Sequence, residues 1–376
     1  NSVNYKEKPD VGTFMREWLS LYDSKSGERG IYNGMSAKNT VEQLNERYKD
    51  GDGKSITRRI AREDFGTNPC SEIILRSREF CNLSECVIRR EDTRESLKEK
   101  VRTAAILGTF QSTLTEFKYL SREWKRNCDE ERLLGVSLTG IMDNPLTNGT
   151  KKGLDILLEE LRTVAYETNK EWADKLGIPV SAAITCVKPS GSVSQLVDSA
   201  SGIHARHNPF YIRTVRADNK DPLCKLMQDM GFPNAADVTK PEHTTVFSFP
   251  MKSPKGAICR MHRSALEQLE LWKVYAENWC EHKPSVTISV KEDEWIEVAS
   301  WVYDHFDSIS GISFLPFSEH VYRQAPYQDC TEEEYIEALK TMPKSVDWTE
   351  LSKYESQDYT IASQELACTA GGCEII

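Results

Sequence analysis

The sequence predicts an α/β protein with parallel strands, and two observations lead to this fold class. Short apolar segments rich in β-branched residues alternate with helical segments of about 12 residues or more, which is typical of strand–helix–strand units. The chain has 376 residues, 39% of them hydrophobic, so it can bury the core of one large domain or of two ordinary ones.

Helices are expected where apolar residues recur three and four positions apart. The clearest case is residues 153–176, in which leucines follow this spacing and Gly177 stands at the position of a C-cap. A long charged segment, residues 92–129, is expected to form a pair of helices. The remaining expected helices span residues 11–21, 37–48, 222–230, 264–280 and 292–306.

Strands are expected in short apolar segments bounded by turn residues. Residues 182–187 (AAITCV) lead into a Pro-Ser-Gly-Ser turn, and residues 210–216 (FYIRTVR) alternate between apolar and polar positions. Beyond residue 343 the pattern fades, so a flexible tail is expected at the end of the chain. The expected strands span residues 133–141 (a strand or a tight turn), 182–187, 210–216, 244–249, 285–290 and 309–315.

Charge and composition exclude several classes of function. The formal net charge of −10 argues against a broad nucleic-acid-binding surface. No apolar run approaches the roughly 20 residues of a membrane span, and the first residues carry no signal-peptide pattern. The 11 cysteines lack the spacing of a secreted disulfide scaffold or of a zinc ribbon, which favours a reducing cytoplasm.

The most informative stretch reads GTNPCSEIILRSREFCNL. Asn68 and Pro69 favour a constrained bend, so Cys70 is expected on a stiff loop and not in a helix. Glu72 returns to the same side of an extended chain as Cys70, and Cys81 is close enough in sequence for the loop to bring the two sulfurs together. A single cysteine is most often an inert core residue, but this combination indicates a site for redox or nucleophilic chemistry.

A second stretch, residues 188–194 (KPSGSVS), connects an expected strand to an expected helix. The free N–H groups of a helix start and the hydroxyls of Ser190, Ser192 and Ser194 suit a phosphate group, and Gly191 allows a close approach. The same residues also fit an ordinary N-cap, so both interpretations stay open.

The end of the chain carries two cysteines, Cys368 and Cys373, in the sequence CTAGGC. Two thiols at this spacing, with glycines between them, can close a disulfide on a flexible segment. A metal site would need further ligands, and none is near in the sequence. A thiol pair that exchanges with an internal disulfide fits this pattern best.

Together these motifs resemble the catalytic chain of ribonucleotide reductases, and within it the adenosylcobalamin-dependent group that acts on ribonucleoside triphosphates. The resemblance rests on TNPCSEIIL, FCNLSE, LLGVSLTGIMDNP, CVKPSGSVSQLVDSASGIHARHNPFYIRTVR, ISGISFLPFSEHVYRQAPYQ and CTAGGC. It implies part of a ten-stranded α/β barrel with a central finger loop and adenosylcobalamin as the radical-generating cofactor. The implied organisation is a C-terminal part of the barrel in residues 1–345, with the finger loop at 66–83 and the phosphate loop at 188–194, followed by a flexible redox tail at 346–376.

The resemblance also implies roles for individual residues. Cys70 matches the cysteine that becomes a thiyl radical and abstracts the 3′ hydrogen of the ribose, and Glu72 matches the general base for the 3′ hydroxyl. Asn68 matches the amide that holds the ribose hydroxyls. Cys81 matches one of the two cysteines that deliver reducing equivalents and end as a disulfide.

Substrate phosphates and the external reductant are assigned in the same way. Cys368 and Cys373 match the tail pair that reduces the internal disulfide and is itself reduced by thioredoxin or a similar protein. No protein-bound metal ion, membrane or nucleic-acid partner is expected. The residues that match the phosphate-gripping loop are Pro189, Ser190, Gly191, Ser192 and Val193.

The sequence departs from the family pattern in one respect. The family places the partner of Cys81 far upstream of the finger loop, and here no cysteine precedes Cys70. The first half-barrel and the allosteric nucleotide-binding segment are also missing. The chain is therefore interpreted as a fragment, or as half of a split enzyme completed by an N-terminal half on another polypeptide, and is expected to be inactive alone.

Two other interpretations remain. One is a fragment of the large subunit of a di-iron-dependent ribonucleoside-diphosphate reductase. The short interval between Cys70 and Cys81 and the absence of an adjacent tyrosine pair argue against it. The other is a catalytically inactive nucleotide-binding half retained for assembly or regulation, which the missing upstream cysteine favours and the intact Cys70 and Glu72 oppose.

Overall fold

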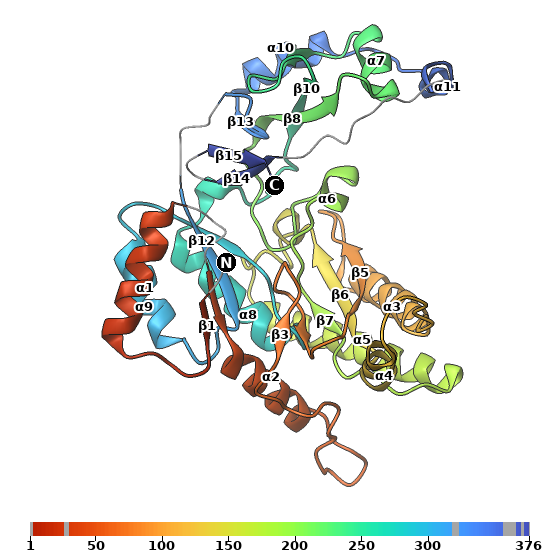
Figure 1. The fold of residues 1–376 in the computed structure, drawn as a ribbon, viewed down its shortest axis with the longest axis vertical. Coiled ribbons are helices and arrows are strands. Elements are labelled where there is room, and N and C mark those ends of the chain that lie inside the picture. Colours follow the sequence, from red (N-terminus) through yellow and green to blue (C-terminus); the bar gives the residue numbers. More distant parts are fainter. Residues whose placement is uncertain (1–2, 26–29, 318–322, 356–365, 370–371, 376) are drawn as a thin grey trace. The chain divides into compact units, whose positions relative to one another are not determined.

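The computed structural model describes residues 3–25, 30–317, 323–355, 366–369 and 372–375. These residues form two compact units, built from segments that alternate along the chain (Figure 1). Among the described residues, no helix has both the length and the apolar character that crossing a membrane requires. Unit 1 comprises Asn1–Arg206, Gly256–Ile258 and His262–Phe317, and unit 2 comprises His207–Lys255, Cys259–Met261 and Ser318–Ile376.

Unit 1 contains three sheets. One is a parallel sheet of order β5-β6-β7, and a second has the order β1-β2-β12-β11, with parallel outer pairs and an antiparallel β2–β12 contact. The third is the small antiparallel pair of β3 and β4. The strands are β1 (Val3–Tyr5), β2 (Gly30–Asn33), β3 (Gly66–Thr67), β4 (Ile74–Leu75), β5 (Asn82–Val87), β6 (Leu134–Thr139), β7 (Thr185–Cys186), β11 (Thr287–Val290) and β12 (Gly311–Pro316).

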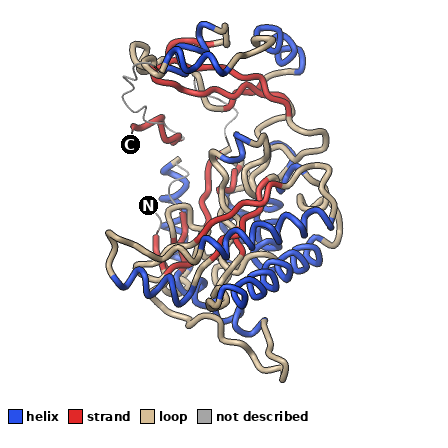
Figure 2. Tube along the Cα trace, turned by 90° about the vertical axis from the view of Figure 1, so that its right-hand side faces the viewer, coloured by secondary structure: helices blue, strands red, loops and turns tan. Residues whose placement is uncertain are grey.

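Helices of unit 1 pack against these sheets. The helices α3 and α5 lie side by side, with α3 against β5 and β6, and Figure 2 shows the long helices of this unit gathered beside its strands. The helix α8 contacts α5, α9 and β11. The helices are α1 (Val11–Ser24), α2 (Gly34–Arg47), α3 (Arg94–Gln111), α4 (Arg122–Glu131), the 3₁₀ turn η1 (Ile141–Asp143), α5 (Leu154–Leu176), α6 (Val193–Leu196), α8 (Ala265–Asn278) and α9 (Trp295–Asp304).

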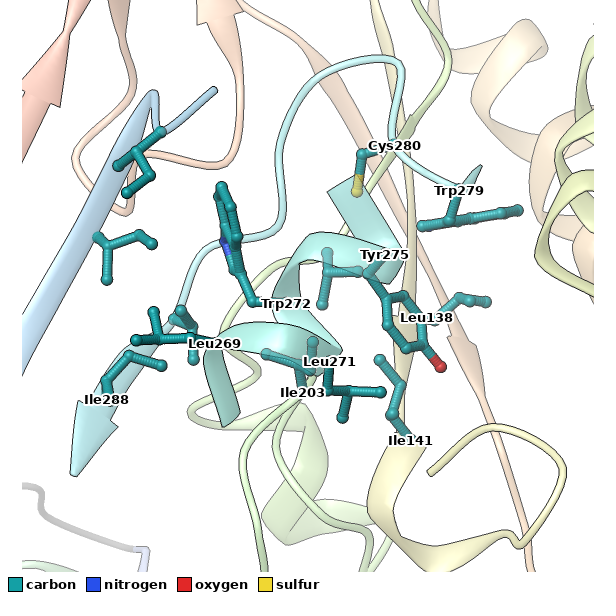
Figure 3. Close-up of a cluster of buried hydrophobic side chains, with 14 of the residues drawn as sticks. Leu138, Ile141, Ile203, Leu269, Leu271, Trp272, Tyr275, Trp279, Cys280 and Ile288 are labelled. Atoms are coloured by element: carbon teal, nitrogen blue, oxygen red, sulfur yellow. The ribbon is translucent and has the colours of Figure 1, made fainter. Parts of the chain in front are cut away.

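The core of unit 1 is organised around α8. Figure 3 shows Trp272 and Tyr275 of this helix among buried apolar side chains from both larger sheets, such as Leu138 of β6 and Ile288 of β11. The buried indole of Trp272 donates a hydrogen bond to Pro284 O (2.8 Å), which satisfies its polar group and ties the segment after α8 to the core. This helix therefore fixes the position of the chain that enters β11.

Unit 2 is built on an antiparallel sheet of order β13-β8-β10-β9. A small apolar cluster around Cys224, Phe232 and Phe247 forms its core. Its elements are β8 (Phe210–Asp218), α7 (Pro222–Asp229), β9 (Asn234–Ala236), β10 (Thr244–Lys252), β13 (Tyr327–Asp329), α10 (Glu332–Thr341), the 3₁₀ turn η3 (Trp348–Glu350), α11 (Leu351–Tyr354), β14 (Leu366–Thr369) and β15 (Gly372–Ile375).

The predicted α/β class is confirmed, but the prediction of parallel strands is only partly right. Parallel pairing holds for β5-β6-β7, β1-β2 and β11-β12, where crossover helices cover the sheet. It is wrong for unit 2, where β8 pairs antiparallel with both β10 and β13, and β10 pairs antiparallel with β9. The described strands form five separate sheets and no closed barrel.

Boundaries along the chain differ from the expected ones in several places. The strand expected at 182–187 is paired as a strand only at Thr185–Cys186, and β5 and α10 were not expected. Within residues 346–376 the structure describes η3, α11 and the β14–β15 pair, whereas 356–365, 370–371 and 376 lie outside the described residues. The boundary expected after residue 345 does not coincide with the division into two units, and a flexible tail there stays a prediction.

Candidate active site

The finger-loop sequence forms a narrow hairpin. Strands β3 and β4 pair in register, Gly66 with Leu75 and Thr67 with Ile74, and leave residues 68–73 as the tip. Because Asn68 precedes Pro69, the chain turns here, as the sequence predicts.

Hydrogen bonds inside the tip stabilise this turn. The Ser71 N–H donates to Asn68 O (2.9 Å), and the Ile73 N–H donates to Asn68 Oδ1 (3.0 Å). Ser71 has φ 65°, a left-handed conformation that is uncommon for serine. Since the side-chain oxygen of Asn68 is used within the loop, its Nδ2 is the atom left to donate to a ligand.

Cys70 lies at the exposed end of the hairpin. Partial burial of the sulfur, followed by the charge of Glu72, raises the pKa of Cys70, and the charge of Lys188 opposes the rise. A raised pKa keeps Cys70 in the thiol form at neutral pH, with an S–H bond intact. Hydrogen-atom transfer requires this protonated form, whereas a nucleophilic role requires the thiolate.

Glu72 is fully buried, at 0% exposure. Neither of its carboxylate oxygens has a hydrogen-bond partner among the described residues. Its charge raises the pKa of both Cys70 and Cys81, so Glu72 lies within electrostatic range of each cysteine. A buried carboxylate with free lone pairs can accept a hydrogen bond or a proton from a substrate.

Cys81 lies at the start of β5, over a glycine of the neighbouring strand. A Cβ at Gly135 would lie 3.2 Å from Cys81 Sγ and 2.4 Å from Leu83 Cδ2, so the glycine makes room for both side chains. Burial first, and then the charge of Glu72, raises the pKa of Cys81 well above its usual value. The hairpin and β5 thus place both cysteines that the sequence singled out within electrostatic range of the Glu72 carboxylate.

One further thiol was not singled out by the sequence. Cys186 on β7 is fully buried and lies opposite Ser137 of β6. Burial raises its pKa well above the usual value, and Cys81 contributes to the rise. The sequence places Cys186 in an apolar strand, which marks it as a core residue and not as a neighbour of Cys81.

The expected phosphate loop is less organised than the hairpin. The helix that follows it, α6, has only four residues, too few for a strong helix dipole. The Ser194 N–H donates to Ser190 Oγ (3.0 Å), and the Ser194 hydroxyl donates to Ser190 O, so these two hydroxyls are used within the loop. The residues between them, Gly191, Ser192 and Val193, are exposed.

The start of this loop approaches the hairpin. The Lys188 N–H donates to Ser137 Oγ on β6 (2.8 Å), and the Lys188 charge acts on both Cys70 and Cys186. The sequence predicts Lys188 as part of this loop, but not as one of the residues that bind phosphate. Pro189 beside it is half-buried.

The hairpin is held from outside by residues 282–285 (HKPS), between α8 and β11. The Lys283 N–H donates to Glu72 O (3.1 Å), and His282 Nδ1 accepts from the Ile74 N–H (3.3 Å). Burial lowers the pKa of His282 well below its usual value, so the ring is neutral and can act as this acceptor.

Two side chains of the same segment reach the tip itself. Ser285 Oγ donates to Cys70 O (2.5 Å), and Lys283 Nζ donates to Ser71 Oγ (3.0 Å). Residues 282–285 therefore hydrogen-bond to the hairpin at Cys70, Ser71, Glu72 and Ile74. Sequence reasoning missed this clamp, because a lysine and a serine around Pro284 carry no local pattern that separates them from surface residues.

The tail cysteines are described only through their backbone. Strands β14 and β15 pair antiparallel, with Cys368 directly opposite Cys373. The pair belongs to unit 2, and the hairpin belongs to unit 1. Among the described residues, no group of His, Cys, Asp or Glu side chains has the arrangement of a metal site.

Comparisons with known proteins bear on this site. No protein-family model matches the chain. It is 25% identical over 381 residues to the adenosylcobalamin-dependent ribonucleoside-triphosphate reductase of Lactobacillus gasseri, which covers 93% of the chain and 49% of that protein. The enzyme of the same name from Euglena gracilis is 27% identical over 284 residues, covering 75% of the chain and 38% of that protein.

The chain is thus similar in sequence to adenosylcobalamin-dependent ribonucleoside-triphosphate reductases. This confirms the resemblance on which the residue assignments rest. The chain spans about half the length of the curated relatives that it matches first.

Solved structures support the fold. A crystal structure of a B12-dependent (class II) ribonucleotide reductase matches with a TM-score of 0.75 at 22% identity, covering 96% of the chain and 51% of that structure. The class Id alpha subunit of Actinobacillus ureae ribonucleotide reductase gives a TM-score of 0.53 at 13% identity, covering 84% and 64%. The larger likeness is to the class II fold.

Proposed function

We propose that the chain forms the reacting part of an enzyme that reduces ribonucleotides, as triphosphates, to 2′-deoxyribonucleotides for DNA precursor synthesis. The observation that carries the proposal is the hairpin itself. It presents the exposed Cys70 thiol beside the buried, unpartnered carboxylate of Glu72, with Cys81 in electrostatic range. The names of the relatives agree with this chemistry.

The first half of the reaction uses the hairpin. When bound, adenosylcobalamin supplies the one-electron oxidation that converts the Cys70 thiol to a thiyl radical, and the exposure of Cys70 fits a group that must reach its sulfur. The Cys70 radical then takes the hydrogen atom from C3′ of the ribose, which re-forms the S–H bond and breaks the C3′–H bond. Glu72 accepts the proton of the 3′ hydroxyl as general base, while Asn68 Nδ2 holds the ribose.

The second half consumes two thiols. The 2′ hydroxyl leaves as water, and Cys70 returns a hydrogen atom to C3′. Ribonucleotide and two thiols thus give deoxyribonucleotide, water and a disulfide. Cys81 is one of these thiols, and its raised pKa keeps the hydrogen that it donates. The second thiol comes from an N-terminal half of the enzyme, on another polypeptide or on a segment outside this chain.

Substrate phosphates and external electrons enter elsewhere. Residues 189–193 contact the phosphates, with the backbone N–H groups of the exposed Gly191, Ser192 and Val193 as donors, and Lys188 supplies positive charge next to them. The tail thiols of Cys368 and Cys373 exchange with the internal disulfide and are reduced by thioredoxin or a similar protein. The cysteine content fits a reducing cytoplasm as the compartment.

The decisive experiment substitutes Cys70 in the complete enzyme. Cys70→Ser is expected to abolish CTP reduction with adenosylcobalamin, and to leave the melting temperature unchanged because the side chain is exposed. Cys330→Ser, a half-buried thiol of unit 2, is the matched control and should retain turnover. Wild-type-like turnover of Cys70→Ser would refute the proposal.

Other experiments separate the alternatives. A di-iron-dependent enzyme would work with a radical-generating subunit and without cobalamin, and an inactive half would show no turnover with either. The larger fold likeness to the class II reductase favours cobalamin dependence.

The role of the tail cysteines has a test of its own. Replacing Cys368 and Cys373 by serine should block repeated turnover with thioredoxin and permit turnover with a small dithiol. Equal loss with both reductants would count against the shuttle role.

A further inference from the structure

The hairpin rests on a buried lysine that no motif singled out. Lys283 is only 1% exposed, although lysine is almost never fully buried without a partner. Its ammonium donates to Ser71 Oγ (3.0 Å) and to Ser310 O (3.2 Å), and it lies 4.8 Å from the centroid of the Tyr32 ring. The two oxygens accept hydrogen bonds from the ammonium of Lys283, but these neutral groups do not balance its buried positive charge.

Strand β12 leaves room for the contact between Lys283 and Ser71. A Cβ at Gly311 on β12 would lie 2.6 Å from Ser71 Oγ and 3.1 Å from Lys283 Nζ. Any larger residue would push the serine and the lysine apart. The left-handed conformation of Ser71 is one that serine rarely adopts, so an outside partner is needed to hold it. Lys283 and Gly311 together provide that support.

Glu72 is the acidic group that acts on Lys283. Burial lowers the pKa of Lys283 to about 7, and the charge of Glu72 opposes the shift. The other titratable groups facing the ammonium are neutral near this pH. Burial raises the pKa of Tyr32 to about 12, and burial together with nearby cations lowers the pKa of His282 well below its usual value.

We propose that Lys283 is the positioning residue of the hairpin tip and the buried cation that stabilises the charge of Glu72. In its charged form the ammonium acts on the carboxylate through space, without a direct hydrogen bond to it. Its hydrogen bond to Ser71, the residue between Cys70 and Glu72, sets the two reacting groups in their relative orientation. The catalytic meaning of this assignment rests on the proposed function. Its electrostatic content does not, because it concerns groups of this chain alone.

A double-mutant cycle on the full chain tests the charge pairing. Lys283→Met leaves the Glu72 carboxylate buried without a balancing charge, and Glu72→Gln removes that charge. At about pH 6, where Lys283 is charged, we expect Lys283→Met to lower the melting temperature, and Lys283→Met/Glu72→Gln to recover at least half of that loss. Melting losses that simply add would overturn the proposal, because they mean that the two residues do not interact.

Two further variants keep the test decisive if Lys283→Met does not fold. Ser71→Ala removes the contact at the tip without burying a charge, and it should change the rate and pH dependence of Cys70 alkylation by iodoacetamide. Lys283→Arg retains the charge and should restore part of the melting temperature. Lys175→Met is the control, because Lys175 is an exposed lysine of α5 paired with Glu171 (2.5 Å), and it should change neither measurement. An unchanged alkylation profile in Ser71→Ala would overturn the positioning role.

Turnover separates this inference from the proposed function. In the complete enzyme, Ser71→Ala and Lys283→Arg should lower kcat by about 10- to 100-fold through misplacement of the reacting groups, with little change in KM. A rise in KM at unchanged kcat would overturn the positioning role. If the wild-type enzyme reduces no ribonucleotide, the proposed function fails, whereas the melting cycle and the alkylation profile still test Lys283.

Discussion

Two loops carry the site, and they are supported in opposite ways. The hairpin tip is held by residues 282–285 through main-chain and side-chain hydrogen bonds, and its carboxylate is buried. The loop at 188–194 bonds mainly to itself, and its central residues are exposed. The difference suits the chemistry proposed for each, because a radical centre must be oriented before the substrate arrives. A phosphate-binding loop can instead gain order from the substrate.

The largest effect is expected at the base on the hairpin. Glu72→Gln keeps the shape of the side chain but cannot accept the proton of the 3′ hydroxyl. Steady-state kinetics of the complete enzyme should show kcat lower by about 10²- to 10⁴-fold. Exchange of Ser192 for alanine in the other loop is the control and should leave kcat within about threefold. An equal loss of kcat in the two variants would mean that the hairpin and the loop at 188–194 do not differ in their roles.

A matched pair of glycines tests how tightly each loop is enclosed. Gly311→Ala places a Cβ 2.6 Å from Ser71 Oγ, whereas nothing lies within 4 Å of a Cβ at Gly191. Gly311→Ala should therefore lower the free energy of unfolding by about 1–3 kcal/mol, and Gly191→Ala should leave it unchanged. Denaturant unfolding of the two variants measures this difference. A Gly311→Ala variant as stable as the wild type would show that the hairpin can shift to accommodate the added methyl group.

Stability as a function of pH reports on the clamp. The pKa of Lys283 is lowered to about 7 in the folded chain, so above pH 7 the unfolded chain binds more protons at this residue. The free energy of unfolding of the wild type should therefore rise relative to Lys283→Met between pH 7 and the usual pKa of lysine. The gain is at most about 1.4 kcal/mol per pH unit. Parallel curves for the two proteins would mean that Lys283 does not titrate in this range.

The smallest effect is expected at the exposed loop. Gly191→Ala should raise the KM for the nucleotide by about three- to tenfold, because a methyl group interferes with close approach of the phosphates. Initial rates over a range of CTP concentrations measure this change, with kcat expected to stay constant. A drop in kcat without a change in KM would place residue 191 in the chemistry and not in binding.

Local patterns predicted much of the fold and of the reacting residues. The spacing of apolar residues located α5 within about one residue, and Gly177 does form its left-handed C-cap. The same kind of pattern identified α8, and composition favoured a strand or a tight turn where β6 forms. It overlooked β5, which begins after the loop at 76–81 that follows the hairpin and contains polar residues. A strand of this kind is defined by its pairing with β6 and not by its own composition.

The sequence by itself determined the turn at Asn68–Pro69, the placing of Cys70 and Glu72 on one loop and the motifs that reveal the kinship, because each depends on neighbours a few residues apart. Only the tertiary structure decided that Lys283 and Ser285 support this loop and that Gly135 makes room for Cys81. Long-range hydrogen bonds and steric contacts bring together segments that lie far apart in the sequence, 212 and 215 residues for the contacts of Lys283 and Ser285. Such contacts leave no periodic signal in a single sequence, since a buried lysine and an exposed one are written with the same letter.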